Sequence, residues 1–490
     1  AGTAVLFFLS LAAFTLVEQQ FFPAADRAEL LVSLTLPHNG SIAGTQREVS
    51  RLEKILLEDA GIAHHTTYVG AGAVRFYLPL NVQLENANFA QVVVVTKSYE
   101  VRDAVRDRLQ RALEEQFPAV LSRVEPLQLG PPVDWPIQYR VGGPDIGEVR
   151  ALADRVAALL QANPTARTIN FNWYDMGRSV LVTVDQEKAR LVGVTSEQVA
   201  RSLDDLLSGR TVTQLRDDIY LVDVRGRAMD QDRRDLASIR DLKLRLPNGN
   251  TSPLAQIASF SYGLEEPVVW RRDRLPTITV QADVVPGIQA ATVNQQLASA
   301  MGKIRASMPP GYRLEEGGAV EQSAKGQRSV LAVIPVMLVL MLFILMVQLQ
   351  SVQKLAMVML TAPLGLIGVT MALLLSHKPF GFVAMLGVFA LTGMIIRNSV
   401  VLIAQIQANE SAGLDRWHAI VDAAAHRLRP ILLTAAAAVL GLMPIAGEVF
   451  WGPMAYAMMG GLLVATVLTL FFLPALYAMW YRVPVEPTHT

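Results

Sequence analysis

Arg397 is the residue of this sequence whose position most needs a chemical explanation. It lies inside the apolar run 380–406, with about seventeen uncharged residues before it and about twelve after it. A guanidinium near the centre of a bilayer costs ~3 kcal/mol on insertion scales. We expect Arg397 to face the interior of a helix bundle and to pair with a carboxylate. The alternatives are that its side chain reaches the membrane surface, or that the helix ends before it.

The carboxylate that would pair with Arg397 is not found in the apolar part of the sequence. Glu448 is the one acidic residue within the apolar runs, and it lies near the opposite end of its run. We therefore expect the partner to come from outside this chain. Because arginine stays protonated at ordinary pH, the titrating group would be that carboxylate, and Arg397 would lower its pKa. The chemistry indicated is a proton relay.

The elements that position Arg397 are apolar runs long enough to cross a bilayer, which takes ~20 residues. The runs are 329–348, 355–376, 380–406, 430–449 and 452–480, and the N-terminal run 1–17 would make a sixth. The first run is slightly short, and we expect Ala1 to be an internal cut. Between the runs, Leu414–His426 is amphipathic and is predicted to lie along the membrane surface.

The short loops predict the orientation, because lysine and arginine stay on the cytoplasmic side of a membrane. Only Lys378 falls in a short loop on the other side. The segment 18–327 should therefore lie outside the cytoplasm, which in a Gram-negative cell is the periplasm. The basic residues that share the cytoplasmic side are Lys354, Arg416, Arg427, Arg429 and Arg482.

The composition agrees with a chain that is part soluble and part membrane. Of the 490 residues 52% are hydrophobic and 18% are charged, and the charges are dense only between Glu18 and Arg328. The formal net charge of zero gives no indication of nucleic-acid binding. The absence of cysteine excludes disulfides and thiolate metal sites.

The soluble segment reads as two β-α-β-β-α-β units. In the first unit we expect strands at 30–36, 92–96 and 120–127, a helix whose start is capped by Thr45 and Glu48, and a helix near 101–112. The second unit has an insertion at 207–268. The predicted fold class is a membrane α-helical bundle plus α+β subdomains of split βαβ type. The elements expected in the second unit are 137–141, 146–160, 168–173, 180–184, 277–283, 291–304 and a strand near Arg313.

Two motifs carry a resemblance to a known family. Gly393-Met-Ile-Ile-Arg-Asn398, followed by Val400–Ile403, resembles the tenth transmembrane helix of resistance-nodulation-division (RND) efflux transporters. Arg427-Leu-Arg-Pro-Ile-Leu-Leu-Thr434 resembles the eleventh. The resemblance covers essentially the whole chain, as the C-terminal half with helices seven to twelve. It implies the proton-relay residues Arg397, Asn398, Arg427 and Thr434. Many multidrug members have lysine at the position of Arg397, so the charge is kept.

The resemblance also implies the domain organisation. The porter subdomains would be 18–130 (PC1-like) and 131–206 with 269–327 (PC2-like), and the docking subdomain would be 207–268. Transmembrane helices would be 1–17 and 328–482, followed by a cytoplasmic tail, 483–490.

The stretch Gly70–Asn88 would be the loop that separates two substrate pockets. Such pockets are largely apolar with few polar groups. Phe76, Tyr77 and Phe89 are therefore candidate apolar contacts, and Arg75 is a candidate polar contact. The alternative is that some of these aromatic residues belong to the subdomain core.

The implied activity is proton-driven export of hydrophobic or amphiphilic compounds, by a transporter rather than an enzyme. No catalytic residue, cofactor or metal site is expected, since the proton motive force supplies the energy. The implied location is the Gram-negative inner membrane. The implied partners are the missing N-terminal half with its pair of relay aspartates, two further copies in a homotrimer, a periplasmic adaptor, an outer-membrane channel, small amphiphilic substrates and the lipid bilayer.

Alternative functions remain open. A heavy-metal pump of the same superfamily would have acidic or methionine pairs at the pore, and Met337, Met341, Met357 and Met359 are candidates, although methionine is an ordinary packing residue. His64-His65 could bind a metal, but adjacent strand residues point to opposite faces. A protein-export accessory subunit of the SecD or SecF kind has a similar span pattern. A receptor-like relative would lack intramembrane carboxylates in the missing half.

Overall fold

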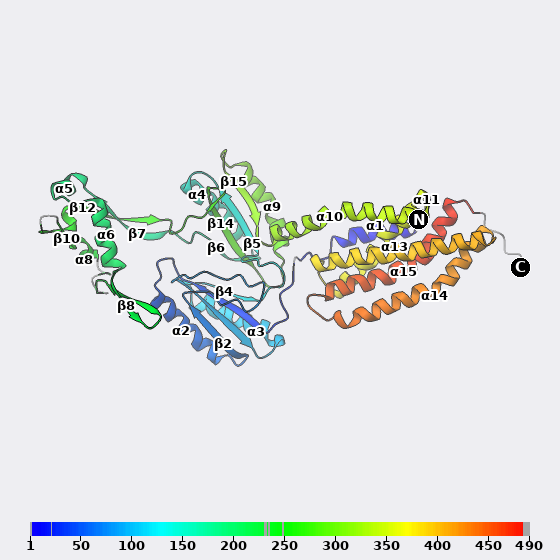
Figure 1. The fold of residues 1–490 in the computed structure, drawn as a ribbon, viewed down its shortest axis with the longest axis horizontal. Coiled ribbons are helices and arrows are strands. Elements are labelled where there is room, and N and C mark those ends of the chain that lie inside the picture. The colour runs from blue at the N-terminus through cyan, green and yellow to red at the C-terminus, as the bar shows by residue number, and fades with distance from the viewer. Residues whose placement is uncertain (1, 21, 230–232, 234–235, 247–248, 484–490) are drawn as a thin grey trace. The chain divides into compact units, whose positions relative to one another are not determined.

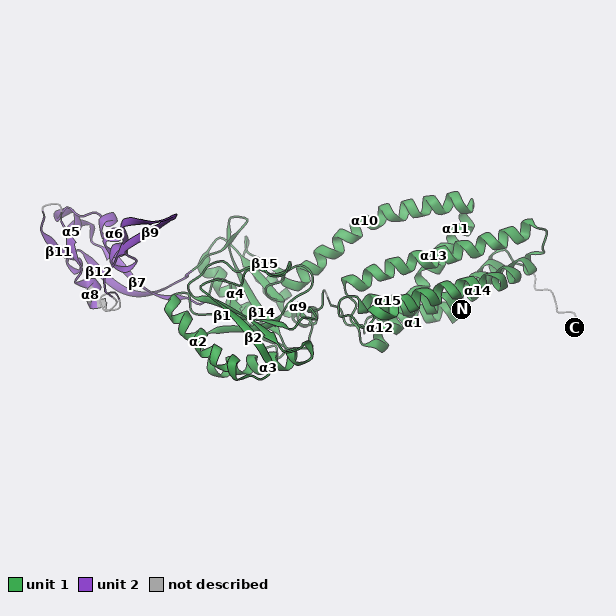
Figure 2. Ribbon diagram, turned by 60° about the horizontal axis from the view of Figure 1, so that its bottom comes forward, with its two compact units in different colours: residues 1–174, 268–490 green, residues 175–267 purple. Residues whose placement is uncertain are grey.

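The computed structural model of the chain describes residues 2–20, 22–229, 233, 236–246 and 249–483. The chain forms two compact units, coloured separately in Figure 2. Unit 1 consists of Ala1–Tyr174 and Val268–Thr490, and unit 2 is Asp175–Pro267. Ala1, Pro247, Asn248 and residues 484–490 of the predicted tail lie outside the described residues.

The first α/β subdomain of unit 1 is a four-stranded antiparallel sheet with two helices (Figure 1). The strand order β2-β3-β1-β4 is that of the split βαβ pattern expected from the sequence. The apolar faces of the strands and helices form one core cluster, in which Leu52, Val92 and Leu109 are fully or almost fully buried. The elements are β1 (Glu29–Thr35), α2 (Ile42–Glu58), β2 (Ile62–Val69), β3 (Phe89–Thr96), α3 (Tyr99–Gln116) and β4 (Leu121–Pro126).

Helix α2 begins one turn earlier than its sequence predicted. Ser41, not Thr45, is the N-cap residue, and its hydroxyl oxygen accepts a hydrogen bond from the Gly44 backbone N–H at 3.1 Å. Thr45 is buried, and its hydroxyl donates to the carbonyl of Ala87 at 2.6 Å. The predicted capping role of Thr45 was therefore wrong, because a tertiary contact uses its hydroxyl instead.

The second α/β subdomain has a sheet in the order β13-β14-β5-β15, with β6 also paired to β14. Its core contains two large buried rings with satisfied polar groups. Trp173 Nε1 donates to the Thr277 carbonyl at 3.0 Å, and the Tyr139 hydroxyl donates to Asn294 Oδ1 at 3.1 Å. The elements are β5 (Ile137–Gly142), α4 (Ile146–Gln161), β6 (Ala166–Phe171), β13 (Arg271–Arg272), β14 (Leu275–Val284), α9 (Ala290–Ala306) and β15 (Arg313–Gly317).

Unit 2 contains a strand that we had expected in the second α/β subdomain. β7 (Gly177–Val184) pairs with β12 (Ala258–Glu265), and Val182 and Val184 pack against the small core of unit 2. Residues 175–206 therefore lie in one unit with 207–267 of the inserted segment, and Val268 belongs to unit 1. Its other elements are α5 (Gln186–Leu191), α6 (Ser196–Leu207), β8 (Arg210–Asp217), β9 (Tyr220–Gly226), α8 (Leu236–Arg240), β10 (Lys243–Arg245), β11 (Thr251–Pro253) and η1 (Leu254–Gln256).

Five helical segments among the described residues are long and apolar enough to cross a membrane, rather than the six runs expected. The sixth run forms a shorter apolar helix, α1 (Gly2–Phe14). The five are α10 (Gly318–Leu349), the segment Val352–Ser376, α13 (Phe382–Ser411), the segment Arg416–Ile445 and α15 (Gly452–Trp480). Val352–Ser376 consists of α11 (Val352–Thr361), η2 (Ala362–Leu364) and α12 (Gly365–Ser376), and Arg416–Ile445 consists of α14 (Arg416–Leu442) and η3 (Met443–Ile445).

The predicted surface helix 414–426 does not exist as a separate element. Its residues form the first part of α14, and Pro430 lies inside that continuous helix. The Asp415 side chain caps the helix by accepting a hydrogen bond from the Trp417 backbone N–H at 3.1 Å. Of residues 416–426, Ala419, Ile420 and Ala423 are buried, and the others are exposed or half-buried.

Small residues allow the helices of the bundle to approach closely. A Cβ added to Gly368 of α12 would lie 2.2 Å from the backbone oxygen of Gly460 of α15. Such a close approach is typical of helix packing in membranes, where backbones meet at glycine and alanine. α15 in turn contacts α13 and α14, so the packing of α12 on α15 helps to position the helices that carry the relay candidates.

Candidate functional site

An ion-pair cluster links the two α/β subdomains of unit 1. Arg123 of β4 donates from Nε to Asp283 Oδ2 of β14 at 2.9 Å, and its Nη1 lies 2.9 Å from Glu125 Oε2. Arg123 also donates to the backbone oxygen of Asp134, and its guanidinium stacks 4.6 Å from the ring centre of Trp135. The Arg123 side chain is only 9% exposed, so its charge is neutralised by these contacts rather than by water.

The cluster perturbs the acid–base behaviour of its members. Burial raises the pKa of Glu125 to about 7, against the opposing effect of Arg123, and the neighbouring Asp134 and Asp283 charges raise it further. Burial also raises the pKa of Asp134. For Arg123, burial favours the neutral form, but the carboxylates of Glu125 and Asp283 outweigh it and raise the pKa. The cluster therefore holds a carboxyl group that titrates near neutral pH.

Two cavities adjoin the cluster, and Arg123 and Glu125 line both. The larger has a volume of about 740 Å³ and extends from Asp283 to Phe380 and Met385 at the end of the helix bundle. The smaller, of about 480 Å³, is lined by aromatic residues that include Trp135, Tyr174 and Trp270. Both volumes fall within the range of small-molecule sites.

The structure brings only some of the predicted pocket residues to these cavities. Tyr77 and Phe89 line the smaller cavity, and the Tyr77 hydroxyl accepts a hydrogen bond from the Gln128 backbone N–H at 3.3 Å. Burial raises the pKa of Tyr77. Phe76, which is 37% exposed, contacts the Tyr77 ring but lines neither cavity, and Arg75 is exposed and lines neither.

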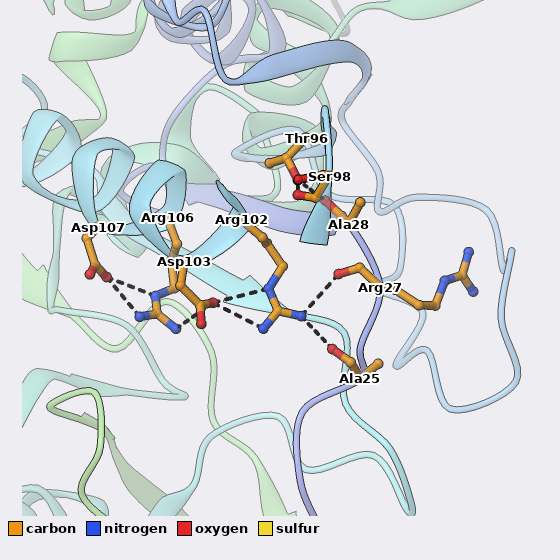
Figure 3. A network of polar contacts seen from close by, with 9 residues as sticks. All are labelled: Ala25, Arg27, Ala28, Thr96, Ser98, Arg102, Asp103, Arg106 and Asp107. Carbon is orange, nitrogen blue, oxygen red and sulfur yellow. Dashed lines mark hydrogen bonds and ion pairs between the residues drawn. The ribbon is translucent and has the colours of Figure 1, made fainter. Parts of the chain in front are cut away.

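The chain between α1 and the first subdomain is tied to α3 by Arg102 (Figure 3). The Arg102 guanidinium is buried and donates to the backbone oxygens of Ala25 and Arg27, and it also pairs with Asp103. At the other end of this linker, the Gln20 N–H donates to the Phe380 oxygen at 3.1 Å. The linker therefore connects the bundle to the subdomain through fixed contacts at both ends.

The predicted relay residues lie on α13 and α14, two helices that pack against each other. Arg397 is exposed and has no hydrogen bond or ion pair within the described part of the chain, whereas Asn398 is buried. Thr434 is exposed, and its hydroxyl donates to the Pro430 carbonyl. Arg427 donates from Nε and Nη2 to Gln405 Oε1, at 3.1 Å and 2.7 Å.

Sequence reasoning missed two groups of residues. Arg123 and Glu125 are two apart on one strand and so share a face, which is a weak signal for a charged cluster. Gln405, Asn409 and Asp422, which lie near Arg427, were missed because residues 414–426 had been interpreted as a surface helix. Within the described ranges no group of three or more His, Cys, Asp or Glu side chains is placed to hold a metal ion.

An apolar helix bundle continuous with two split βαβ subdomains and the cavities beside them defines a membrane transporter. The chain belongs to the AcrB/AcrD/AcrF family of RND efflux transporters, which it matches over residues 1–480.

Two curated relatives are similar along nearly the whole chain. The nickel and cobalt resistance protein CnrA of Cupriavidus metallidurans is 28% identical over 95% of this chain and 44% of its own length. The nickel-cobalt-cadmium resistance protein NccA of Alcaligenes xylosoxydans xylosoxydans is 27% identical over 98% of this chain and 46% of its own. The chain thus spans about half the length of the curated relatives it matches.

Solved structures share the fold. Two crystal forms of a heavy metal efflux pump superpose with TM-scores of 0.81 and 0.79, at 23% and 24% identity. The alignments cover 98% and 97% of this chain, and 49% and 50% of the pump chain. The RND family expected from the sequence is therefore confirmed. The two relatives, however, favour the heavy-metal alternative over the multidrug branch.

Proposed function

We propose that this chain is one half of a proton-driven efflux transporter that exports divalent transition-metal cations across the cell envelope. The observation that carries the proposal is the similarity, over 95% and 98% of the chain, to two proteins named for nickel, cobalt and cadmium resistance. The transporter would lie in the inner membrane of a Gram-negative cell, with 18–327 in the periplasm.

The Arg123 cluster supplies the electrostatics that a cation exporter needs. Three carboxylates, those of Glu125, Asp134 and Asp283, surround one guanidinium. Above the raised pKa values of Glu125 and Asp134 all three are ionised, and the cluster then has an excess of negative charge beside both cavities. Negative potential in a cleft concentrates cations there. Carboxylate oxygens bind Ni²⁺ and Co²⁺ less tightly than imidazole or thiolate, which suits a cargo that must be released.

We assign proton coupling to Arg397, Asn398, Arg427 and Thr434. The carboxylates of the relay would come from the additional half that is present in the relatives. The exposed and unpaired guanidinium of Arg397 supports this assignment, because a charge in a membrane span needs a partner and the described residues supply none. The energy would come from the proton motive force, with no cofactor.

The proposed assembly is a homotrimer that docks on a periplasmic adaptor and an outer-membrane channel. The hairpin of β8 and β9 in unit 2 supports it. Every residue of both strands is exposed, and among them Leu215, Tyr220 and Leu221 are large and apolar. An exposed apolar patch of this kind marks a surface for another protein.

A second candidate function is the export of amphiphilic organic compounds. The cavity of about 740 Å³ favours it, because the volume suits a drug-sized molecule better than a single ion. Tyr77 and Phe89, which line the smaller cavity, would then contact apolar parts of the substrate.

Growth of an efflux-deficient Gram-negative strain distinguishes the two candidates. The strain would carry either the wild-type transporter or its Arg397→Ala variant. The transporter here means this chain together with the additional half that is present in its relatives. We expect the wild type to raise the tolerated concentrations of Ni²⁺ and Co²⁺ several-fold and those of amphiphilic dyes very little, and the variant to give neither gain. A gain for dyes without a gain for the cations would replace the first candidate by the second.

A further inference from the structure

A chain of side-chain hydrogen bonds leads away from Arg427. Its guanidinium donates twice to Gln405 Oε1 of α13, at 3.1 Å and 2.7 Å. Gln405 Nε2 donates to Asn409 Oδ1, one helical turn further along α13, at 2.9 Å. Asn409 Nδ2 donates to Asp422 Oδ2 of α14 at 3.0 Å and to the Ala419 carbonyl at 3.2 Å. This series of hydrogen bonds begins and ends on α14 and passes through α13.

The groups at the two ends of this series of hydrogen bonds determine which atoms donate and which accept along it. A guanidinium has only donors, so Gln405 must present its oxygen to Arg427 and its amide nitrogen to Asn409. A carboxylate and a backbone carbonyl have only acceptors, so Asn409 must present its nitrogen to Asp422 and Ala419 and its oxygen to Gln405. All four requirements are met together, and both amides therefore have one satisfied orientation.

Burial makes this arrangement specific. Asn409 is 8% exposed, so an amide turned the wrong way would leave its polar atoms without water. The second carboxylate oxygen of Asp422 lies 3.0 Å from His426 Nδ1, which gives Asp422 a second fixed contact. The neighbouring Glu410 contacts other groups, namely the Tyr477 hydroxyl of α15 at 3.4 Å and Arg416 at 3.9 Å.

We propose that Gln405 is a positioning residue for the Arg427 guanidinium, and that Asn409, held by Asp422 and the Ala419 carbonyl, sets the orientation of Gln405. The proposal rests on the proposed function, in which Arg427 belongs to the proton relay. A guanidinium free to rotate would spend less time beside the relay carboxylates and would stabilise their charged form less. The pKa of those carboxylates would then rise.

The test uses the transporter reconstituted in liposomes, with Co²⁺ as the probe and uptake measured as a function of pH on the proton-releasing side. For Gln405→Ala we expect a rate about ten-fold lower and a profile displaced to higher pH by about half a unit or more, because proton release from a weaker acid needs a higher pH. Gln405→Glu keeps an acceptor for Arg427 and should restore most of the rate. Asp415→Asn, which removes a carboxylate from the same end of α14 but can still cap the helix, should behave as wild type.

A double-mutant comparison tests the contact itself. If Gln405 acts through Arg427, then Gln405→Ala should lower the rate no further in an Arg427→Ala background. An unshifted pH profile for Gln405→Ala would overturn the proposal. So would a double variant whose loss of transport rate equals the product of the losses of the two single variants. The wild type, Gln405→Ala, Arg427→Ala and the double variant should also show non-additive shifts of the thermal unfolding midpoint. A wild type that moves no Co²⁺ would refute the proposed function, and the midpoint shifts would still decide whether Gln405 and Arg427 are coupled.

Discussion

Arg123 Nε of β4 lies 2.9 Å from Asp283 Oδ2 of β14, and this ion pair joins residues 160 positions apart in two separately folded subdomains. The two sheets have separate cores, so the relative position of the subdomains depends on contacts of this kind. Arg123 lines both cavities, whereas Asp283 lines the larger one.

The Arg123–Asp283 pair should contribute measurably to stability. Arg123→Ala leaves the carboxylates of Glu125, Asp134 and Asp283 without their counter-ion, and we expect it to lower the free energy of unfolding by about 3 kcal/mol. Asp283→Asn, which keeps a hydrogen-bond acceptor, should cost about 1 kcal/mol. Thermal unfolding followed by tryptophan fluorescence measures both, since Trp135 stacks on Arg123. Equal midpoints for the wild type and Arg123→Ala would show that the pair contributes nothing.

Glu125 should make stability fall as the pH rises. Its pKa is raised from the ordinary 4.5 to about 7 in the folded protein, so between these values the folded state binds more protons than the unfolded state. The free energy of unfolding is then greatest below pH 4.5, decreases through this window by at most about 3 kcal/mol, and is level above pH 7 as far as Glu125 is concerned.

The control for that pH dependence is Glu125→Gln, which cannot titrate. Thermal midpoints measured from pH 4.5 to 8 should fall less steeply for this variant than for the wild type. Parallel curves would mean that the pKa of Glu125 is the same in the folded and unfolded states. Asp134, whose pKa burial also raises, acts in the same direction.

The close contact between α12 and α15 predicts a strong effect of one added methyl group. Gly368→Ala would place Cβ 2.2 Å from the Gly460 oxygen, so the helix backbones must separate, at a cost of about 1–3 kcal/mol. Gly393→Ala in α13 is the matched control, because nothing lies within 4 Å of its Cβ position. Detergent-solubilised Gly368→Ala should unfold at a lower temperature than Gly393→Ala, and the reverse order would contradict the packing described.

The sequence predicted the split βαβ order and most strands of the two sheets, because their helices have regular apolar stripes and their strands are rich in buried apolar residues, but it did not predict β2 or β13. It could not predict that β7 pairs with β12, since the exposed and half-buried residues of β7 alternate equally well in either sheet. The start of α14 was missed because an amphipathic stripe looks the same on a membrane surface and on a helix bundle. The Arg123–Asp283 pair depends on long-range topology that no local pattern encodes.

Only some of the predicted pocket residues line a cavity, and this difference can be tested. Tyr77 lines the smaller cavity, whereas its neighbour Phe76 lines neither. Tyr77→Ala should therefore change the relative resistance to different substrates more than Phe76→Ala does. Resistance profiles of the two variants, at matched expression, measure this. A larger change for Phe76→Ala would mean that the loop reaches a site formed with the rest of the transporter.

We propose that this chain supplies the basic side of a proton relay that drives metal export. The most direct measurement is proton release from acid-loaded liposomes that contain the transporter, recorded with an internal pH dye after Co²⁺ is added, for the wild type and Arg397→Ala. We expect Co²⁺-dependent proton release by the wild type and its loss in a correctly assembled Arg397→Ala variant, with Arg397→Lys partly active. Equal Co²⁺-dependent proton release by the wild type and Arg397→Ala would contradict the proposal.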